Sequence, residues 1–116
     1  MAKSKYNVAP KSERTLGGVT YMSKLEKSYR QRLNMLTKAK DLGDRVVDIK
    51  EQVPFSIDIN GKHICKYLLD FQVTYGDMRV EYVDVKGVRT SVYSIKKKLV
   101  EAVHKIKIKE VTKKDF

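Results

Sequence analysis

Apolar positions recur at helical spacing between residues 20 and 43. They form one stripe of five residues: Met22, Leu25, Tyr29, Leu33 and Leu36. Ser23 is followed three residues later by Glu26, which fits a capping box and predicts a helix that starts at Ser23. Gly43 is a natural stop for this helix.

The middle of the chain alternates apolar and polar residues, as strands with one buried face do. After a link over residues 45–54, we expect strands over 55–59, 62–75 and 78–86. Asn60-Gly61 is a strong signal for a two-residue hairpin, and Gly76-Asp77 marks the next turn. This region therefore predicts a three-strand meander.

A second helix is expected from Thr90 or Ser91 to about His104, followed by a half-exposed strand over residues 105–111. Its predicted inner stripe is Val92, Ile95, Leu99 and Val103. Residues 1–19 show no periodicity, and we interpret them as a flexible basic arm in front of a single domain over residues 20–116. The fold class predicted is α/β, in the order helix, three-strand meander, helix, strand.

The charge is uneven along the 116 residues, which carry a net charge of +11. Residues 1–50 have 12 basic and 5 acidic side chains, residues 51–93 have 5 and 6, and residues 94–116 have 8 and 3. Two basic flanks around a slightly acidic centre favour a polyanionic partner, and nucleic acid is the commonest. A solvated, lysine-rich surface is the alternative.

Cys65 is the single cysteine, so no internal disulfide can form, and we expect a reducing compartment such as the cytoplasm. The apolar runs are shorter than a membrane span. We therefore expect no membrane partner.

Charged residues interrupt the apolar pattern of the third strand. Asp84 and Lys86 alternate with Val83 and Val85, so both project from one face. With a two-residue turn at Gly76-Asp77, these side chains and Asp70 of the preceding strand would lie on opposite faces. A three-residue turn or one bulge would instead pair Asp70 with Asp84, and such a pair requires a cation between the two carboxylates.

In that second register, the two carboxylates suit Mg²⁺ or Mn²⁺, with the backbone carbonyl of Val85 as a further ligand. The cation would lower the pKa of a bound water and stabilise charge on a reacting phosphate. Lys86 would orient that water or neutralise the developing charge.

An aspartate followed on the next strand by Asp-x-Lys, after an acidic helix, resembles the PD-(D/E)XK nuclease superfamily. The runs GVTYMSKLEKSYRQRL, LLDFQV and YVDVKGVRTSVYSIKKKL are similar to a family of short, mostly uncharacterised phage proteins assigned to that superfamily. The order of elements also resembles that of a phage junction-resolving endonuclease I. The resemblance covers about residues 17–111.

The resemblance implies a restriction-endonuclease-like fold and a set of site residues. Glu26 would be the helical carboxylate, Asp70 and Asp84 the metal-binding pair, and Lys86 the catalytic lysine. Members of the superfamily commonly place basic groups on the next helix, where Lys96 and Lys97 stand here, and we expect those two to contact phosphates. No proline precedes Asp70, which departs from the superfamily pattern.

Simpler interpretations stand beside these assignments. The capping box alone accounts for Glu26 without catalysis. A second Asp-x-Lys, Asp48 to Lys50, lacks an acidic partner one strand earlier, and we interpret it as a surface ion pair.

The sequence therefore predicts a metal-dependent DNA endonuclease. The resemblance implies that it is encoded by a phage or prophage and is selective for branched or junction DNA. A symmetric homodimer would suit so small an enzyme that cuts two strands. The alternative is a non-catalytic nucleic-acid-binding module.

Overall fold

The computed structural model describes residues 10–17, 19–21, 23–86 and 89–115. The elements in chain order are α1 (Lys11–Arg14), β1 (Thr15–Leu16), β2 (Val19–Thr20), α2 (Lys24–Leu36), β3 (Val46–Ile59), β4 (Lys62–Tyr75), β5 (Val80–Val85), α3 (Ser91–His104), β6 (Ile108–Val111) and a 3-10 turn over Lys113–Asp115. The protein is thus of mixed α/β class.

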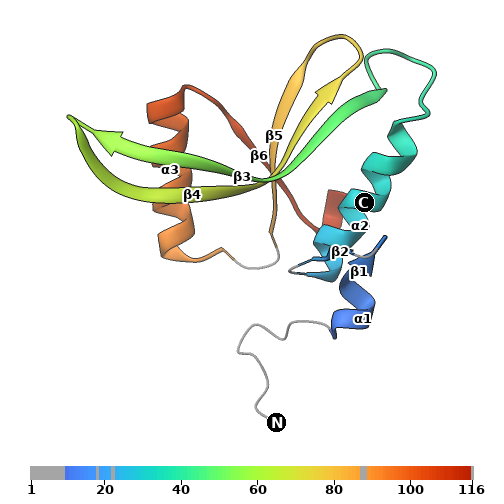
Figure 1. The fold of residues 1–116 in the computed structure, drawn as a ribbon, viewed down its shortest axis with the longest axis horizontal. Helices are drawn as coiled ribbons and strands as arrows, with labels where there is room; N and C mark the ends of the chain where they lie inside the picture. Colours follow the sequence, from blue (N-terminus) through green and yellow to red (C-terminus); the bar gives the residue numbers. More distant parts are fainter. Residues whose placement is uncertain (1–9, 18, 22, 87–88, 116) are drawn as a thin grey trace.

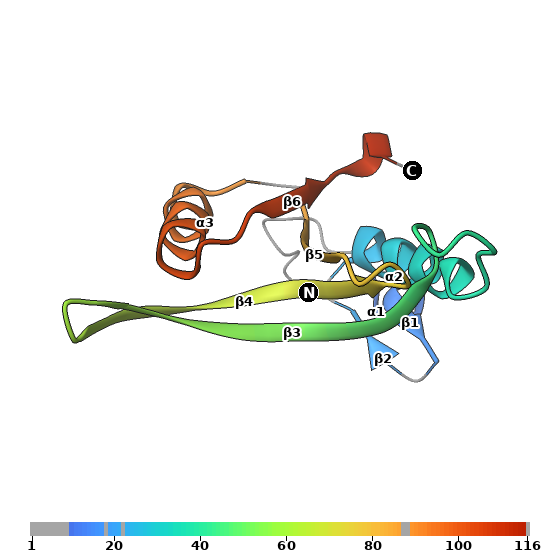
Figure 2. The same ribbon diagram turned by 90° about the horizontal axis from the view of Figure 1, so that it is seen from above.

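Four strands form one sheet in the order β3-β4-β5-β6. The pairs β3–β4 and β4–β5 are antiparallel, whereas β5 and β6 are parallel. A parallel pair needs a crossover connection, and α3 provides it. The long β3–β4 hairpin runs across the molecule, with α3 beside its turn end and α2 near its other end (Figures 1 and 2).

The predicted flexible arm, residues 1–19, contains a short helix, and its last described residues form a small hairpin with Thr20. Strands β1 and β2 pair antiparallel, Thr15 with Thr20 and Leu16 with Val19. Leu16 packs against the hydrophobic core beside α2. The folded part of the chain therefore begins earlier than predicted, while residues 1–9 lie outside the described part.

Helix α2 starts where the capping box predicts. Ser23 is the N-cap, and its Oγ accepts a hydrogen bond of 3.0 Å from the backbone N–H of Glu26. The helix ends at Leu36, earlier than the predicted Gly43, because Thr37 caps it and the apolar stripe ends there. Met22, predicted on the inner stripe, lies outside the described residues.

Strand β3 corrects the predicted link over residues 45–54. It begins at Val46 and pairs with β4 along nearly its whole length. Charged residues in this segment hid the alternation, and Pro54 argued against a strand. Proline is acceptable here because β3 is an edge strand of the sheet.

The inner face of α3 differs from the predicted one. The helix has the expected bounds, with Thr90 as its N-cap. However, Val92 is 62% exposed and Ile95 is 60% exposed, and Val100 is the fully buried residue. The helix is therefore rotated, so that Tyr93 and Val100 face the hairpin. Of the stripe predicted as buried, Leu99 packs against this cluster, whereas Val92, Ile95 and Val103 are exposed.

Two hydrophobic clusters share the sheet. One lies against α2 and includes Tyr29, Leu33, Phe71, Val73 and Val83. The other lies against α3 and includes Ile57, Tyr67, Leu69, Val100 and Ile108. Asp70 stands between Leu69 of one cluster and Phe71 of the other, so it lies where the two clusters meet.

Candidate active site

The turn between β4 and β5 decides which residues face each other. The N–H of Tyr75 donates to the carbonyl of Arg79 over 2.9 Å, which leaves Gly76, Asp77 and Met78 as a three-residue loop. Met78 has a left-handed backbone with φ 75°, as the last residue of such loops commonly does. The odd-length turn that the functional interpretation required is therefore present.

The resulting register places Asp70 opposite Asp84. Phe71 pairs with Val83 as the last pair of the β4–β5 ladder, and the next step along the two strands is Asp70 with Asp84. Residues directly opposite in a sheet share a face. The structure therefore has the second of the two registers that the sequence allowed, with the two aspartates on one face.

Each of the two carboxylates accepts a hydrogen bond from the opposite strand. Asp84 Oδ1 accepts from the N–H of Asp70 over 3.2 Å, and Asp70 Oδ2 accepts from the N–H of Val85 over 2.9 Å. These bonds continue the link between β4 and β5 where the backbone ladder stops. The two side chains are thereby fixed in place by backbone donors.

Burial dominates the electrostatics of the pair. Asp84 is fully buried, and its Oδ2 has no hydrogen-bond partner. Burial raises the pKa of both aspartates above the usual value of the carboxyl group, while Lys86 opposes the rise in each case. A buried carboxylate oxygen without a partner needs a proton or a cation to compensate it.

Lys86 lies one residue beyond the end of β5, and the alternation of an extended chain places it on the same face as Asp84. Its Nζ lies 4.1 Å from the centroid of the Tyr93 ring, a cation–π distance. Tyr93 is held in turn by a 2.9 Å hydrogen bond from its hydroxyl to Glu110. No ion pair within 4.0 Å joins Lys86 to either aspartate. The Lys86 ammonium therefore lies over the Tyr93 ring, close enough to the two carboxylates for its charge to lower their pKa values.

The backbone of Val85 also turns toward this site. Its N–H points to Asp70, and in an extended strand the carbonyl of the same residue points to the same side. The next residue faces the other way, because the N–H of Lys86 donates to the carbonyl of Val111 on β6. The carbonyl predicted as a ligand therefore faces β4.

Glu26 reaches the site through a residue that the sequence did not single out. Its side chain is 4% exposed, and Oε1 accepts a 3.3 Å hydrogen bond from Nε2 of Gln52. Gln52 lies opposite Asp70 on the neighbouring strand and lowers the pKa of that carboxyl group. Glu26 is therefore part of the helix cap and also a buried carboxylate bonded to the residue that faces Asp70.

The two predicted phosphate contacts differ in their surroundings. Lys96 Nζ donates to the backbone carbonyl of Lys66 over 3.3 Å. Lys97 pairs with Glu101 over 3.6 Å and lowers the pKa of Asp84 through its charge. Lys97 thus lies close enough to the aspartate pair to act on it, and both lysines are partly buried.

The other Asp-x-Lys lies elsewhere. Asp48 and Lys50 are exposed on the edge strand β3, and Lys50 pairs with Gln72. No ion pair within 4.0 Å connects these two described residues, so the predicted surface pair is absent.

A divalent cation fits the donor set in one respect. The unpartnered Oδ2 of Asp84 is a buried oxygen of the kind that Mg²⁺ and Mn²⁺ prefer. Among the described residues, no group of three or more His, Cys, Asp or Glu side chains could hold a metal ion. A cation here would therefore rely on two carboxylates and backbone or solvent oxygens.

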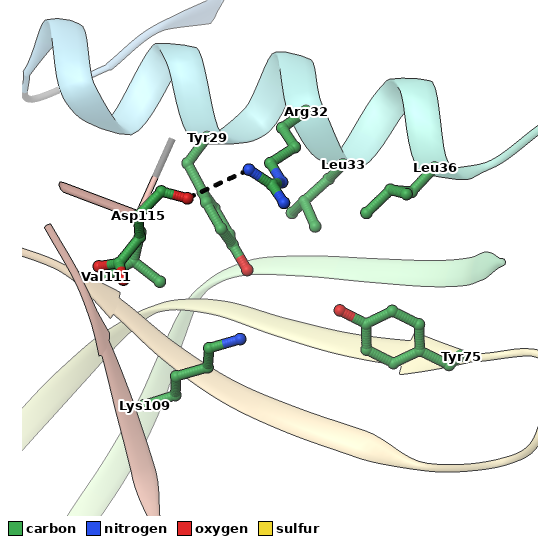
Figure 3. A pocket seen from close by; sticks show the side chains of 8 residues that line it. All are labelled: Tyr29, Arg32, Leu33, Leu36, Tyr75, Lys109, Val111 and Asp115. Carbon is green, nitrogen blue, oxygen red and sulfur yellow. Dashed lines mark hydrogen bonds between the residues drawn. The ribbon is translucent and has the colours of Figure 1, made fainter. Parts of the chain in front are cut away.

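Two surface pockets lie outside this cluster. One, of about 200 Å³, opens between α2, β4 and β6, with Tyr29, Arg32, Tyr75 and Lys109 among its lining (Figure 3). Arg32 donates to the backbone carbonyl of Asp115 at its rim. The other, of about 430 Å³, is lined by Lys24, Leu25, Ser28 and Lys113. Neither pocket includes Asp70 or Asp84 in its lining.

Sequence reasoning missed Gln52 and Tyr93. Gln52 fell in the segment assigned to a link, so its position opposite Asp70 could not be anticipated. Tyr93 carried one usable signal, because it lies seven residues after Lys86, at the start of the crossover helix.

The chain belongs to the family described as "Protein of unknown function (DUF1064)", which matches residues 3–114. No curated protein and no solved structure matches it. Across the described residues, none of the helices has both the length and the apolar character needed to cross a membrane.

Proposed function

We propose that this protein is a divalent-metal-dependent DNA endonuclease with a restriction-endonuclease-like arrangement of the PD-(D/E)XK type. One observation carries the proposal: Asp70 and Asp84 face each other, each fixed by a backbone N–H of the opposite strand, and one buried oxygen of Asp84 has no partner. Like charges opposite each other destabilise a sheet. A cation bound between them would explain why they are there.

Asp70, Asp84 and the Val85 carbonyl would hold Mg²⁺ or Mn²⁺. When bound, such a cation supplies Lewis-acid chemistry at a phosphate. The bonds from Asp70 N–H and Val85 N–H keep the two carboxylates oriented before it arrives. This preorganisation means that binding requires little rearrangement of the sheet.

Lys86 is proposed to act on the reacting phosphate. Its long stem can carry the ammonium from the Tyr93 ring to a phosphate oxygen, where it neutralises developing charge. In hydrolysis, a water oxygen bonds to phosphorus and one ester oxygen leaves as an alcohol after taking a proton. Lys86 or a carboxylate of the site would orient that water.

DNA is the proposed substrate because of the charge distribution. The net charge of +11 resides in the two flanks, and Lys96 and Lys97 lie on the helix beside the site. Branched or junction DNA, a phage context and a homodimer follow from the resemblance to junction-resolving phage nucleases.

The decisive experiment incubates a panel of labelled single-stranded, duplex, flapped and four-way-junction DNAs with the protein and Mg²⁺ or Mn²⁺. We expect metal-dependent cleavage by the native protein and none by Asp84→Asn. In Lys86→Ala, cleavage should be lost while salt-sensitive DNA binding survives. Asp48→Asn is the matched control, since it changes the other Asp-x-Lys and should leave cleavage intact.

If the native protein cleaves none of these DNAs with either metal, the nuclease proposal is wrong. Retained DNA binding in that case would support the alternative, a non-catalytic nucleic-acid-binding module. Loss of binding together with cleavage in Lys86→Ala would contradict the role proposed for Lys86.

A further inference from the structure

Gln52 has an unusual backbone for its position. Its φ is 51°, in the left-handed region that residues with a β-carbon rarely adopt. The other described non-glycine residues with positive φ are Asn60 and Met78 in hairpin turns and Lys105 at the C-cap of α3. Gln52 instead lies inside a strand of 14 residues. A strained backbone conformation in the middle of a strand persists only where contacts with the surrounding structure stabilise it.

The strain coincides with the aspartate pair. Glu51 pairs with Phe71 and Val53 pairs with Leu69, so Gln52 lies directly opposite Asp70. The pairing keeps its register on both sides of this position, which means that the unusual backbone changes the direction of one residue and leaves the alignment of the strands intact.

The side chain of Gln52 connects two carboxylates from different elements. Nε2 donates to Oε1 of Glu26 on α2 over 3.3 Å, and the same residue lies opposite Asp70 on β4, close enough to lower the pKa of that carboxyl group. A glutamine amide nitrogen carries two hydrogens, so it can serve two acceptors at once. Because Glu26 is buried, its carboxylate depends on hydrogen-bond partners within the protein, and Gln52 is one of them.

A neutral amide suits this position for a reason of charge. Two carboxylates near each other repel, and a lysine or arginine between them would cancel part of their negative charge. A glutamine amide can bridge them by hydrogen bonds and leaves their full negative charge available to a cation. Residues that orient metal ligands in this way commonly change metal affinity by about 10–100-fold when they are removed.

We propose that Gln52 is a positioning residue, whose left-handed backbone directs its amide so that buried Glu26 is fastened to Asp70 and Asp70 is oriented for a divalent cation. This inference rests on the proposed function and deepens it. It assigns to Gln52, on the edge strand β3, the role of coupling Glu26 on α2 to the aspartate pair.

The test separates the backbone of Gln52 from its amide. Gln52→Gly removes the amide and adopts positive φ without strain, so this variant is expected to fold. Gln52→Leu removes the amide and retains the strain. The matched control is Gln72→Leu, which removes an amide two residues from Asp70 on the same face of β4. Mn²⁺ affinity is measured by calorimetry without DNA, with Asp84→Asn to identify binding at this site.

We expect Mn²⁺ affinity to fall about tenfold or more in both Gln52 variants and to stay within about twofold in Gln72→Leu. Circular dichroism and a cooperative melting transition well above the temperature of the titration would show that Gln52→Gly is folded, so that lost affinity is not lost folding. Native-like affinity in Gln52→Gly would overturn the inference while leaving the nuclease proposal intact. Absence of Mn²⁺ binding by the native protein, or binding that Asp84→Asn does not reduce, would overturn both.

Discussion

Asp84 combines full burial, one hydrogen bond from a backbone N–H and one oxygen with no partner. A side chain chosen for stability alone would not have this combination, because an unsatisfied buried acceptor costs about 1–3 kcal/mol. The stabilising forces around it come from its apolar neighbours. We therefore attribute the presence of this carboxylate to a ligand and not to the fold, and this gives a test that needs no DNA.

Burial raises the pKa of Asp84 in the folded state, so in the pH interval between the two pKa values the folded protein holds a proton that the unfolded chain has already released. The stability linked to this proton is present below the unfolded pKa, about 4, and is lost as pH rises through the folded pKa. Without metal, Asp84→Asn should therefore be more stable than the native protein at pH 7, by about 1 kcal/mol or more. The gain should shrink toward pH 4, as followed by thermal unfolding.

Asp58 is the control, because its pKa is shifted in the opposite direction to that of Asp84. A hydrogen bond with His63 holds the pKa of its exposed carboxyl group below the usual value. The stability linked to Asp58 is present above the unfolded pKa and is lost as pH falls through the folded pKa. Asp58→Asn should thus gain nothing at pH 7. A destabilised Asp84→Asn at that pH would count against the interpretation of Asp84.

Among the secondary-structure elements, the β4–β5 turn has the largest consequence for the site. The side-chain period of a strand is two, so a change of one residue in the loop moves every later side chain of β5 to the other face. Gly76 fits because a β-carbon there would lie 2.9 Å from the carbonyl oxygen of Leu42. Met78 has the positive φ that this loop length requires.

Deleting Met78 should therefore remove Asp84 and Lys86 from the face of Asp70. We expect Mn²⁺ binding and cleavage to be abolished in this variant, with the sheet content by circular dichroism retained. Met78→Gly is the control of equal length. It keeps the register and should raise stability by about 1 kcal/mol, since glycine adopts positive φ at little cost. Mn²⁺ affinity that survives the deletion would show that the register does not build the site.

The sequence predicted the elements with clear periodicity and marked boundaries. The start of α2 at Ser23, the bounds of β4 and those of α3 were correct because caps and turn residues mark them. The facing aspartates were predicted only conditionally, because a turn of two residues and one of three were both compatible with Gly76-Asp77. The three-residue loop resolved that choice.

Other features depend on contacts that are remote in sequence. The first half of β3 is charged and contains Pro54, and it is a strand because β4 pairs with it. The rotation of α3 follows from the packing of Tyr93 and Val100 on the hairpin, whereas its apolar stripe alone indicated Val92 and Ile95. Gln52 required both the register and the backbone angle, neither of which its own residue type reveals.

For the protein as a whole, the charge distribution predicts how binding depends on salt. Each phosphate neutralised by lysine or arginine releases counterions, so the logarithm of the DNA affinity falls linearly with that of the salt concentration. The net charge of +11 predicts a steep fall. Six phosphate contacts would weaken binding by about a thousandfold between 50 and 200 mM salt.

Variants of Lys96 and Lys38 distinguish DNA contacts along α3 from attraction by the total charge of the protein. Lys96 lies on α3 beside the aspartate-bearing strands, whereas Lys38 is exposed in the segment after α2, at the opposite end of the molecule (Figure 1). If the DNA backbone crosses α3, Lys96→Gln should reduce the salt slope by about one and weaken binding to all sequences alike. Lys38→Gln removes the same formal charge and should leave the slope nearly unchanged. Fluorescence anisotropy over a salt series measures both, and equal effects of the two variants would mean that DNA is attracted by the total charge without lying along α3.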